Sequence, residues 1–342
     1  MKKLYFIILI LICQISFAQK VTEVERPILS DDYIQLIQDI NQQKDSAVIK
    51  NIEILETGIK KASNNFEKYK IAQILTILYT RTNQLEKSIE VWNNLNNSGI
   101  ILPFYKDEVY PSIISAYLNN EDFKSFYETN EELRKNANIA NKAKYFVNLP
   151  SNYSRKKKYP LLIIIHDEIN DLYGISKNWV SDKIQNNYIT VYTQGRELTG
   201  SYSYKYGSHG AEDITKIYKK VAKKYSVNKK KVIIASQYSG AKLAIDAACN
   251  SLKPKGLLLV IPTKPDNFNS EDAAKLKKKN VKVNIHCGQK DYEYFEQQME
   301  LVSVLDSSEV ANSIVIYPNA GHELPNNFPQ QIDKSLKFLI EK

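Results

Sequence analysis

Hydroxyl, carboxylate and imidazole side chains follow three different apolar runs of this chain. Tyr238 and Ser239 follow the first run, Asp291 the second and His322 the third. A hydroxyl activated by an imidazole that is itself oriented by a carboxylate is a nucleophilic catalyst of acyl transfer. In an open parallel sheet, residues at the carboxyl ends of the strands meet at one edge, so the residues just after each strand are the candidates for a site.

The elements that would position these residues can be predicted from periodicity. Short apolar runs rich in β-branched residues alternate with amphipathic helical stretches, which predicts an α/β fold with a mostly parallel central sheet. The predicted strands are 145–149, 161–166, 189–193, 232–235, 257–261, 281–286 and 314–317. The predicted helices include 210–225, 240–250, 293–306 and 330–342. Two further segments, 170–179 and 195–209, are predicted to be long loops.

Four motifs in this half resemble those of the α/β-hydrolase superfamily. They are the strand and loop of 159–168, the strand–turn–helix unit of 232–241, and the loops 286–291 and 319–322. Their chain order, elbow, then acid, then histidine, is the order of that fold. They are most similar to the dienelactone hydrolases, the phospholipase/carboxylesterase group and feruloyl-esterase-like enzymes. The resemblance covers residues 143–342 and implies a hydrolase of carboxylic esters in which Asp291 accepts a hydrogen bond from His322.

The elbow departs from the family's Gly-x-Ser-x-Gly pattern. It reads Ser236-Gln237-Tyr238-Ser239-Gly240, so Tyr238 occupies the nucleophile position. A phenolic oxygen lies several ångströms farther from its Cα than a serine Oγ and would overshoot the imidazole, and its ordinary pKa is near 10. Ser239 is the alternative nucleophile, which would require a one-residue shift of the turn. Ser239 and Lys242 also have the spacing of a Ser-x-x-Lys motif.

The loop that would supply the oxyanion donors also departs from the family's pattern. His166 is followed by Asp167 and Glu168, where the family prefers glycine and small residues. Carboxylates close to a developing oxyanion oppose the field that such a loop must supply. Elsewhere, His286 is interpreted as a packed histidine at a strand end, and Asp213 as a helix-start residue. No cluster has the spacing of a metal site and no glycine-rich phosphate loop is present, so no metal or cofactor is expected.

Tyrosines alternate along the segment after Arg196. Tyr202, Tyr204 and Tyr206 either stack on a sugar or an aromatic acid at the mouth of the pocket, or are ordinary core and surface residues. The candidate ligands of the pocket are accordingly a small ester or a glycan.

The N-terminus has the pattern of a signal peptide. Lys2 and Lys3 precede an apolar run, and Ser16-Phe17-Ala18 offers small residues at a cleavage site, so residues 1–18 are predicted to be removed on export to the periplasm or the medium. No later segment has the length of a membrane helix. Cys249 and Cys287 remain, and their type and number fit either buried side chains or a disulfide.

Residues 19–142 are predicted to form a separate helical domain before the 143–342 domain. Apolar residues recur at three- and four-residue spacing, and Tyr79 and Tyr117 occupy matching positions of a weak internal repeat. The pattern resembles degenerate tetratricopeptide-type helical hairpins. It fits either a plain packing module or a surface for a protein partner.

The net charge of +9 arises from lysines spread over predicted turns, and no nucleic-acid motif accompanies them, so a nucleic-acid partner is not expected. Three functions fit the sequence. The first is an exported, non-catalytic binding protein, or pseudoenzyme, with a decayed esterase pocket. The second is an active carboxylesterase-like hydrolase that uses Ser239, His322 and Asp291. The third is a helical-repeat adaptor with a scaffold hydrolase domain.

Overall fold

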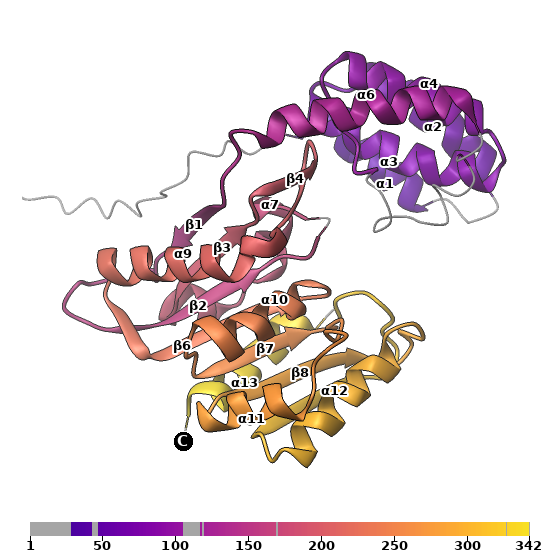
Figure 1. Cartoon of the computed structure of the whole chain (residues 1–342). Helices are drawn as coiled ribbons and strands as arrows, with labels where there is room; N and C mark the ends of the chain where they lie inside the picture. The colour runs from indigo at the N-terminus through magenta and orange to yellow at the C-terminus, as the bar shows by residue number, and fades with distance from the viewer. Residues whose placement is uncertain are drawn as a thin grey trace, which may run out of the picture.

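The computed structural model describes residues 29–42, 47–104, 117, 120–168, 170–325 and 327–341 (Figure 1). The predicted signal peptide lies outside the described residues. A helical region comes first along the chain, and an α/β region built on one sheet follows it.

The helical region is a chain of neighbouring helices. They are α1 (Asp31–Gln42), α2 (Val48–Lys61), α3 (Asn65–Arg81), α4 (Leu85–Asn97) and α6 (Glu121–Asn138). The side chains of Asn64 and Asn120 cap α3 and α6 by accepting backbone N–H groups. The Trp92 ring packs against Phe104 and Tyr117 in the core that joins α3, α4 and α6. Contacts join α1 to α2, α2 to α3, α3 to α4 and α4 to α6, so the predicted helical region is confirmed, while the tetratricopeptide-type hairpin repeat stays a prediction.

One seven-stranded sheet forms the centre of the α/β region, in the order β1-β3-β2-β6-β7-β8-β9. Only β1 is antiparallel to its neighbour. Its strands are β1 (Lys144–Asn148), β2 (Tyr159–Ile165), β3 (Ile189–Gln194), β6 (Val227–Gln237), β7 (Gly256–Val260), β8 (Lys282–Gly288) and β9 (Asn312–Tyr317). All seven predicted strands are therefore confirmed, with ends that differ by a few residues.

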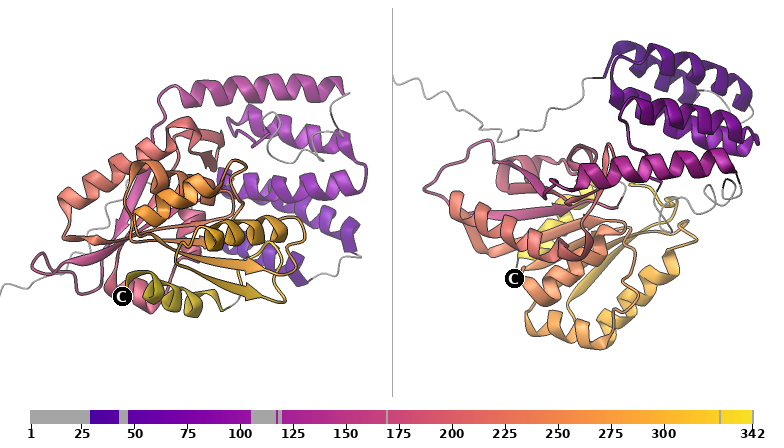
Figure 2. Two further views of the ribbon diagram at one scale, coloured as in Figure 1. Left: turned by 60° about the horizontal axis from the view of Figure 1, so that its bottom comes forward. Right: turned by 45° about the horizontal axis from the view of Figure 1, so that its top comes forward.

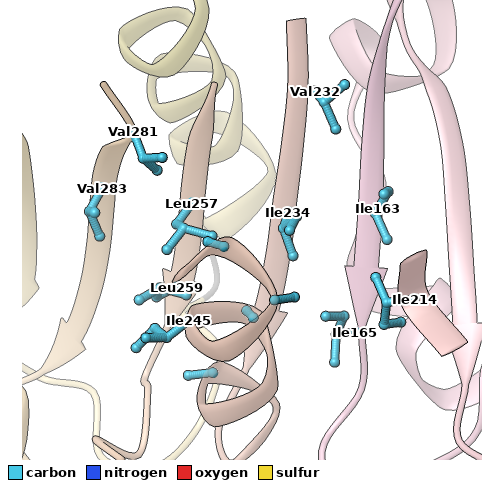
Figure 3. Packing of buried hydrophobic residues seen from close by; sticks show 14 of the residues in the cluster. Ile163, Ile165, Ile214, Val232, Ile234, Ile245, Leu257, Leu259, Val281 and Val283 are labelled. Carbon is cyan, nitrogen blue, oxygen red and sulfur yellow. The ribbon is translucent and has the colours of Figure 1, made fainter. Parts of the chain in front are cut away.

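Helices cover both faces of this sheet. One face carries α9 (Gly210–Lys224), α10 (Gly240–Asp246), α11 (Ser270–Lys278) and α12 (Phe295–Ser307). The other carries α7 (Leu172–Asn178), α8 (Asp182–Asn187) and α13 (Phe328–Ile340). Since side chains alternate along a strand, Ile163 of β2 enters the first core and Ile164 the second. Figure 3 shows Ile163 and its neighbours from β6, β7 and β8 in the first core, beside Ile214 of α9 and Ile245 of α10.

The two segments predicted as long loops contain regular structure. Residues 170–179 include α7, which Asp171 caps by accepting from the N–H groups of Tyr173 and Gly174. Residues 195–209 include the hairpin of β4 (Glu197–Gly200) and β5 (Ser203–Lys205), followed by a 3-10 turn, η2 (Gly207–His209). The loop prediction was wrong because strands of three and four residues are too short to show an alternating pattern.

The β4–β5 hairpin joins the two regions of the molecule, and Figures 1 and 2 show it reaching the helices beside α6. At its tip, Ser201 exchanges two hydrogen bonds of 2.8 Å with the backbone of Ile101. The Tyr202 ring packs against Phe66 and Tyr69, with centroids 4.9 and 5.2 Å away. The hairpin thus belongs to the α/β region by sequence but is held by the helices.

Two tyrosines of this segment are packing residues. Tyr202 lies between the two regions, and Tyr206 is buried with its hydroxyl donating to the Thr193 carbonyl at 3.0 Å. Tyr206 in addition lines a cavity beside η2 and α10.

Cys249 and Cys287 are both buried and free, so no disulfide joins them. Within the described ranges, no helix is long and apolar enough to cross a membrane.

Candidate active site

The turn between β6 and α10 has the backbone of a nucleophile elbow. Tyr238 at its apex has a φ of +49°, in the left-handed region that non-glycine residues rarely adopt. The conformation is held by two backbone hydrogen bonds, from Tyr238 N to the Val260 carbonyl and from Thr263 N to the Tyr238 carbonyl. A Cβ at Gly240 would lie 2.6 Å from the His166 carbonyl oxygen, so the close approach of α10 to the end of β2 requires glycine there.

An acid and a histidine meet beside this turn. Asp291 follows β8 and His322 follows β9, and the His322 Nδ1 lies 2.9 Å from the Asp291 Oδ2. The Gln298 side chain donates to the same carboxylate oxygen at 3.2 Å. Asp291 is buried, whereas the His322 side chain is 42% exposed. The two loops touch, because a Cβ at Gly288 would lie 2.2 Å from the Gly321 carbonyl oxygen.

Elbow, acid and histidine thus follow three parallel strands of one sheet in the order that this superfamily uses. Residues 144–340 have the α/β-hydrolase fold. In this α/β-hydrolase region, a tyrosine stands where the nucleophilic serine is expected.

No protein-family model and no curated protein matches the sequence. Among solved structures, an uncharacterized protein from Bacillus cereus ATCC 10987 is similar over 90% of this chain and 98% of its own, with 20% identity and a TM-score of 0.50. A carboxylesterase from Mesorhizobium loti covers 56% of this chain and 93% of its own, with 16% identity and a TM-score of 0.46. A thermophilic esterase from Thermogutta terrifontis is similar over 58% of this chain and 87% of its own, with 11% identity and a TM-score of 0.45.

At these identities the likeness concerns the fold alone. The Bacillus cereus protein is similar over more of the chain than the α/β-hydrolase region can supply, so the likeness extends into the helical region.

The Tyr238 side chain lies over the imidazole of His322. Its ring stacks on the His322 imidazole with centroids 4.5 Å apart and planes 26° apart, and Tyr294 packs against the same imidazole at 4.8 Å. No hydrogen bond joins Tyr238 to His322 among the described residues. Burial, reinforced by the carboxylates of Asp167, Glu323 and Asp291, raises the pKa of Tyr238 to about 12. The phenol is therefore protonated at neutral pH and is not aimed at a general base.

The Ser239 hydroxyl has a different neighbour. Its Oγ accepts a hydrogen bond from the Glu168 N–H at 3.2 Å, and in the part of the chain that the structure describes no hydrogen bond joins it to His322. That amide belongs to the loop that supplies an oxyanion donor in this fold. The neighbouring Asp167 is buried, and its Oδ2 accepts from Asn170 at 3.3 Å and from Gln237 at 3.5 Å.

Two further histidines are structural. His166 accepts from the Gly195 N–H through Nε2, its Nδ1 contacts the Asp167 carbonyl, and burial lowers its pKa. His286 contacts the Tyr317 hydroxyl at 2.7 Å through Nδ1, and burial lowers its pKa to about 4. Both side chains therefore stay neutral near pH 7. His286 is packed in the interior, as predicted, but it lies within β8, two residues before the strand ends.

Sequence reasoning missed three residues that contact the site or its supports. Tyr294 and Gln298 lie three and seven residues after Asp291, a spacing that puts them on the same side of a helical turn and that could have indicated them. Arg196 makes a two-pronged ion pair with the buried Asp213, the helix-start residue of the sequence prediction. No group of histidine, cysteine and acidic side chains among the described residues could hold a metal ion.

Proposed function

We propose that this chain is an exported α/β-hydrolase-fold protein that acts by binding and does not hydrolyse esters. The observation that carries the proposal is the stacking of Tyr238, at the elbow position, on His322. The signal-peptide pattern of residues 1–18 supports export.

Acyl transfer needs a nucleophile, a free general base and an oxyanion donor, and all three are compromised here. The Tyr238 phenol has a pKa of about 12, and its ring covers His322. The Glu168 amide is engaged by Ser239. Loss of a triad nucleophile costs about 10⁶ in turnover, and loss of one oxyanion donor costs roughly another hundredfold or more. Even if these losses combine only partly, turnover should fall below detection.

The retained Asp291–His322 pair is the feature that an active enzyme would share. An active carboxylesterase would have to turn the Ser239 hydroxyl away from the Glu168 N–H and toward His322. The geometry supports an Asp291–His322 pair that is kept as a structural hydrogen bond. An active serine hydrolase is the alternative that the experiment must exclude.

The test compares the native protein with two single variants, His322→Ala and Ser239→Ala. We expect p-nitrophenyl acetate to be hydrolysed no faster by the native protein than by either variant, and we expect no labelling by a fluorophosphonate probe. Peptide mapping that places the label on Ser239, together with its loss in His322→Ala, would refute the proposal and establish the serine hydrolase instead.

A further inference from the structure

A cavity of about 510 Å³ lies on the other side of the elbow from Tyr238. Its walls come from the oxyanion loop, the first turns of α10, the turn η2 and the base of the β4–β5 hairpin. Its polar lining includes Glu168, Glu197, Lys205, Ser239, Lys242 and Asp246. Its volume lies within the range of roughly 300–1,000 Å³ that small-molecule sites occupy.

This cavity is separate from the candidate active site. Neither Tyr238 nor His322 lines it. The Tyr238 side chain packs against the core between the sheet and α13, whereas Leu243, which does line the cavity, packs against the core beneath α9 and α10. Adjacent residues of one turn thus face opposite sides, and Ser239 faces the cavity.

The charges of the lining define the class of ligand. Three carboxylates, Glu168, Glu197 and Asp246, and two ammonium groups, Lys205 and Lys242, border the same space, which gives a formal sum of −3 + 2 = −1. A neutral apolar ester would displace water from this charged lining and return no charge-assisted hydrogen bond. A simple anion would meet a lining that is net negative. A molecule with both signs can pair its cationic group with Glu197 and its anionic group with Lys242.

Glu197 is built into one wall. Gly207 has a φ of +63°, and a Cβ there would lie 1.6 Å from the Glu197 Oε1, so the absence of a side chain at Gly207 leaves room for this carboxylate. No ion pair to Glu197 exists among the described residues. Its carboxylate can therefore accept from a ligand ammonium group, as a charge-assisted hydrogen bond.

Lys242 and Ser239 line the cavity at the start of α10. The Lys242 ammonium is 4.0 Å from Asp266, whose side chain is 95% exposed, so this pair is weak and screened by water. The Ser239 oxygen accepts from Glu168 N–H, which leaves its own hydrogen free to be donated. An ammonium and a hydroxyl donor side by side suit a carboxylate.

We propose that this cavity binds a small zwitterion of the amino-acid or short-peptide class, with its ammonium group at Glu197 and its carboxylate at Lys242 and Ser239. The inference rests on the proposed binding role and names the ligand class for it. Turnover of p-nitrophenyl acetate tests the proposed function, and peptide binding tests this inference, so either can fail alone.

The experiment is isothermal titration calorimetry of the full mature chain with L-alanyl-L-alanine, its N-acetyl derivative and its C-terminal amide. We expect the dipeptide to bind, and each derivative, which lacks one terminal charge, to bind about tenfold or more weakly. Glu197→Gln should remove the preference for a free ammonium group, and Lys242→Met the preference for a free carboxylate.

Glu212→Gln and Lys216→Met are matched controls, because these residues pair with each other on the surface of α9 and do not line the cavity. Both should bind the dipeptide like the native protein, and thermal melting should show that all four variants are folded. The inference is overturned if the native protein does not bind the dipeptide at millimolar concentrations. It is equally overturned if both derivatives bind as well as the dipeptide, or if the affinity survives both cavity substitutions.

Discussion

The four histidines of the chain show how packing decides what one type of side chain does. His166 and His286 are buried and neutral, and His209 lies 3.5 Å from Glu212 on the surface. His322 differs from His209 in that its carboxylate partner, Asp291, is buried while the imidazole keeps an exposed edge. The buried pair should therefore contribute to the pH dependence of folding.

The first prediction concerns that pH dependence. The pKa of His286 is about 4 in the folded chain and near 6.5 when it is unfolded, so the unfolded state takes up the proton first. The resulting stability is fully present above pH 6.5 and is lost as the pH falls toward 4, by at most about 3 kcal/mol. Urea unfolding at several pH values should show it.

His286→Gln is expected to flatten that slope, although the slope due to His166 remains. An equal slope in the native protein and in His286→Gln would contradict the assignment.

The positions of Tyr238, Asp291 and His322 could be predicted because strand, turn and helix motifs fix the path of the backbone. The direction of the Ser239 side chain could not, because it depends on the Glu168 amide, a partner 71 residues away. The contact of Tyr294 with His322 likewise follows from loop packing and leaves only a weak trace in the sequence.

At the scale of single elements, the end of α10 depends on one lysine. The helix continues into a π-turn, η3 (Ala247–Ser251). The last carbonyl groups of a helix have no partner within it. The Lys279 ammonium donates to the carbonyls of Ala248, Cys249 and Leu252 at 2.8, 2.7 and 3.0 Å. Burial lowers the pKa of this lysine, so its three hydrogen bonds offset a cost of desolvation.

Lys279→Met should therefore destabilise the α/β-hydrolase region by about 1–3 kcal/mol, because the carbonyls lose a charged donor. Lys278→Met, at an exposed neighbouring position, is the matched control and should change stability by less than about 0.5 kcal/mol. Chemical denaturation of the two variants distinguishes them, and equal stabilities would show that the three hydrogen bonds are not stabilising.

A second element-scale prediction concerns the β4–β5 hairpin. The Asn138 side chain accepts from Leu198 N at 2.7 Å and donates to the Leu198 carbonyl at 2.9 Å. Asn138→Ala removes both bonds from an edge strand, so hydrogen exchange of residues 197–205 should accelerate by about tenfold or more. Asn141→Ala is the control. Unchanged exchange in Asn138→Ala would mean that Tyr202 alone holds the hairpin.

The long apolar strands of the sheet were predictable because four or more buried residues in a row leave an unmistakable pattern. The hairpin was not, since β5 has three residues and its stability comes from helices more than 60 residues earlier in the chain. Local sequence carries little information about an element that is stabilised by distant partners.

At the scale of the whole molecule, the cores of the two regions are separate. The residues around Leu55 and Trp92 fill the helical region, and the two cores that line the sheet include Ile163 and Ile164. The hairpin provides the main bridge between them, through a handful of polar and aromatic contacts. These contacts involve far fewer residues than the hydrophobic core of either region.

We therefore expect scanning calorimetry to resolve two unfolding transitions. Ile163→Ala should lower the midpoint temperature of only the α/β-hydrolase transition, and Leu55→Ala that of only the helical transition. Because both side chains are fully buried, each substitution should reduce the free energy of unfolding of its region by about 2–5 kcal/mol. A single transition that both substitutions shift equally would show instead that the hairpin makes the two regions one cooperative unit.

The contact of two tyrosine rings with His322 has a spectroscopic consequence. Aromatic ring currents displace the resonances of nearby protons, so the rings of Tyr238 and Tyr294 should displace the imidazole C–H signals of His322. Loss of one signal in His322→Ala would assign it. Tyr238 and Ser239 are neighbours in the turn between β6 and α10. The His322 resonance, which senses the Tyr238 ring, should therefore shift when a ligand binds in the cavity that Ser239 lines.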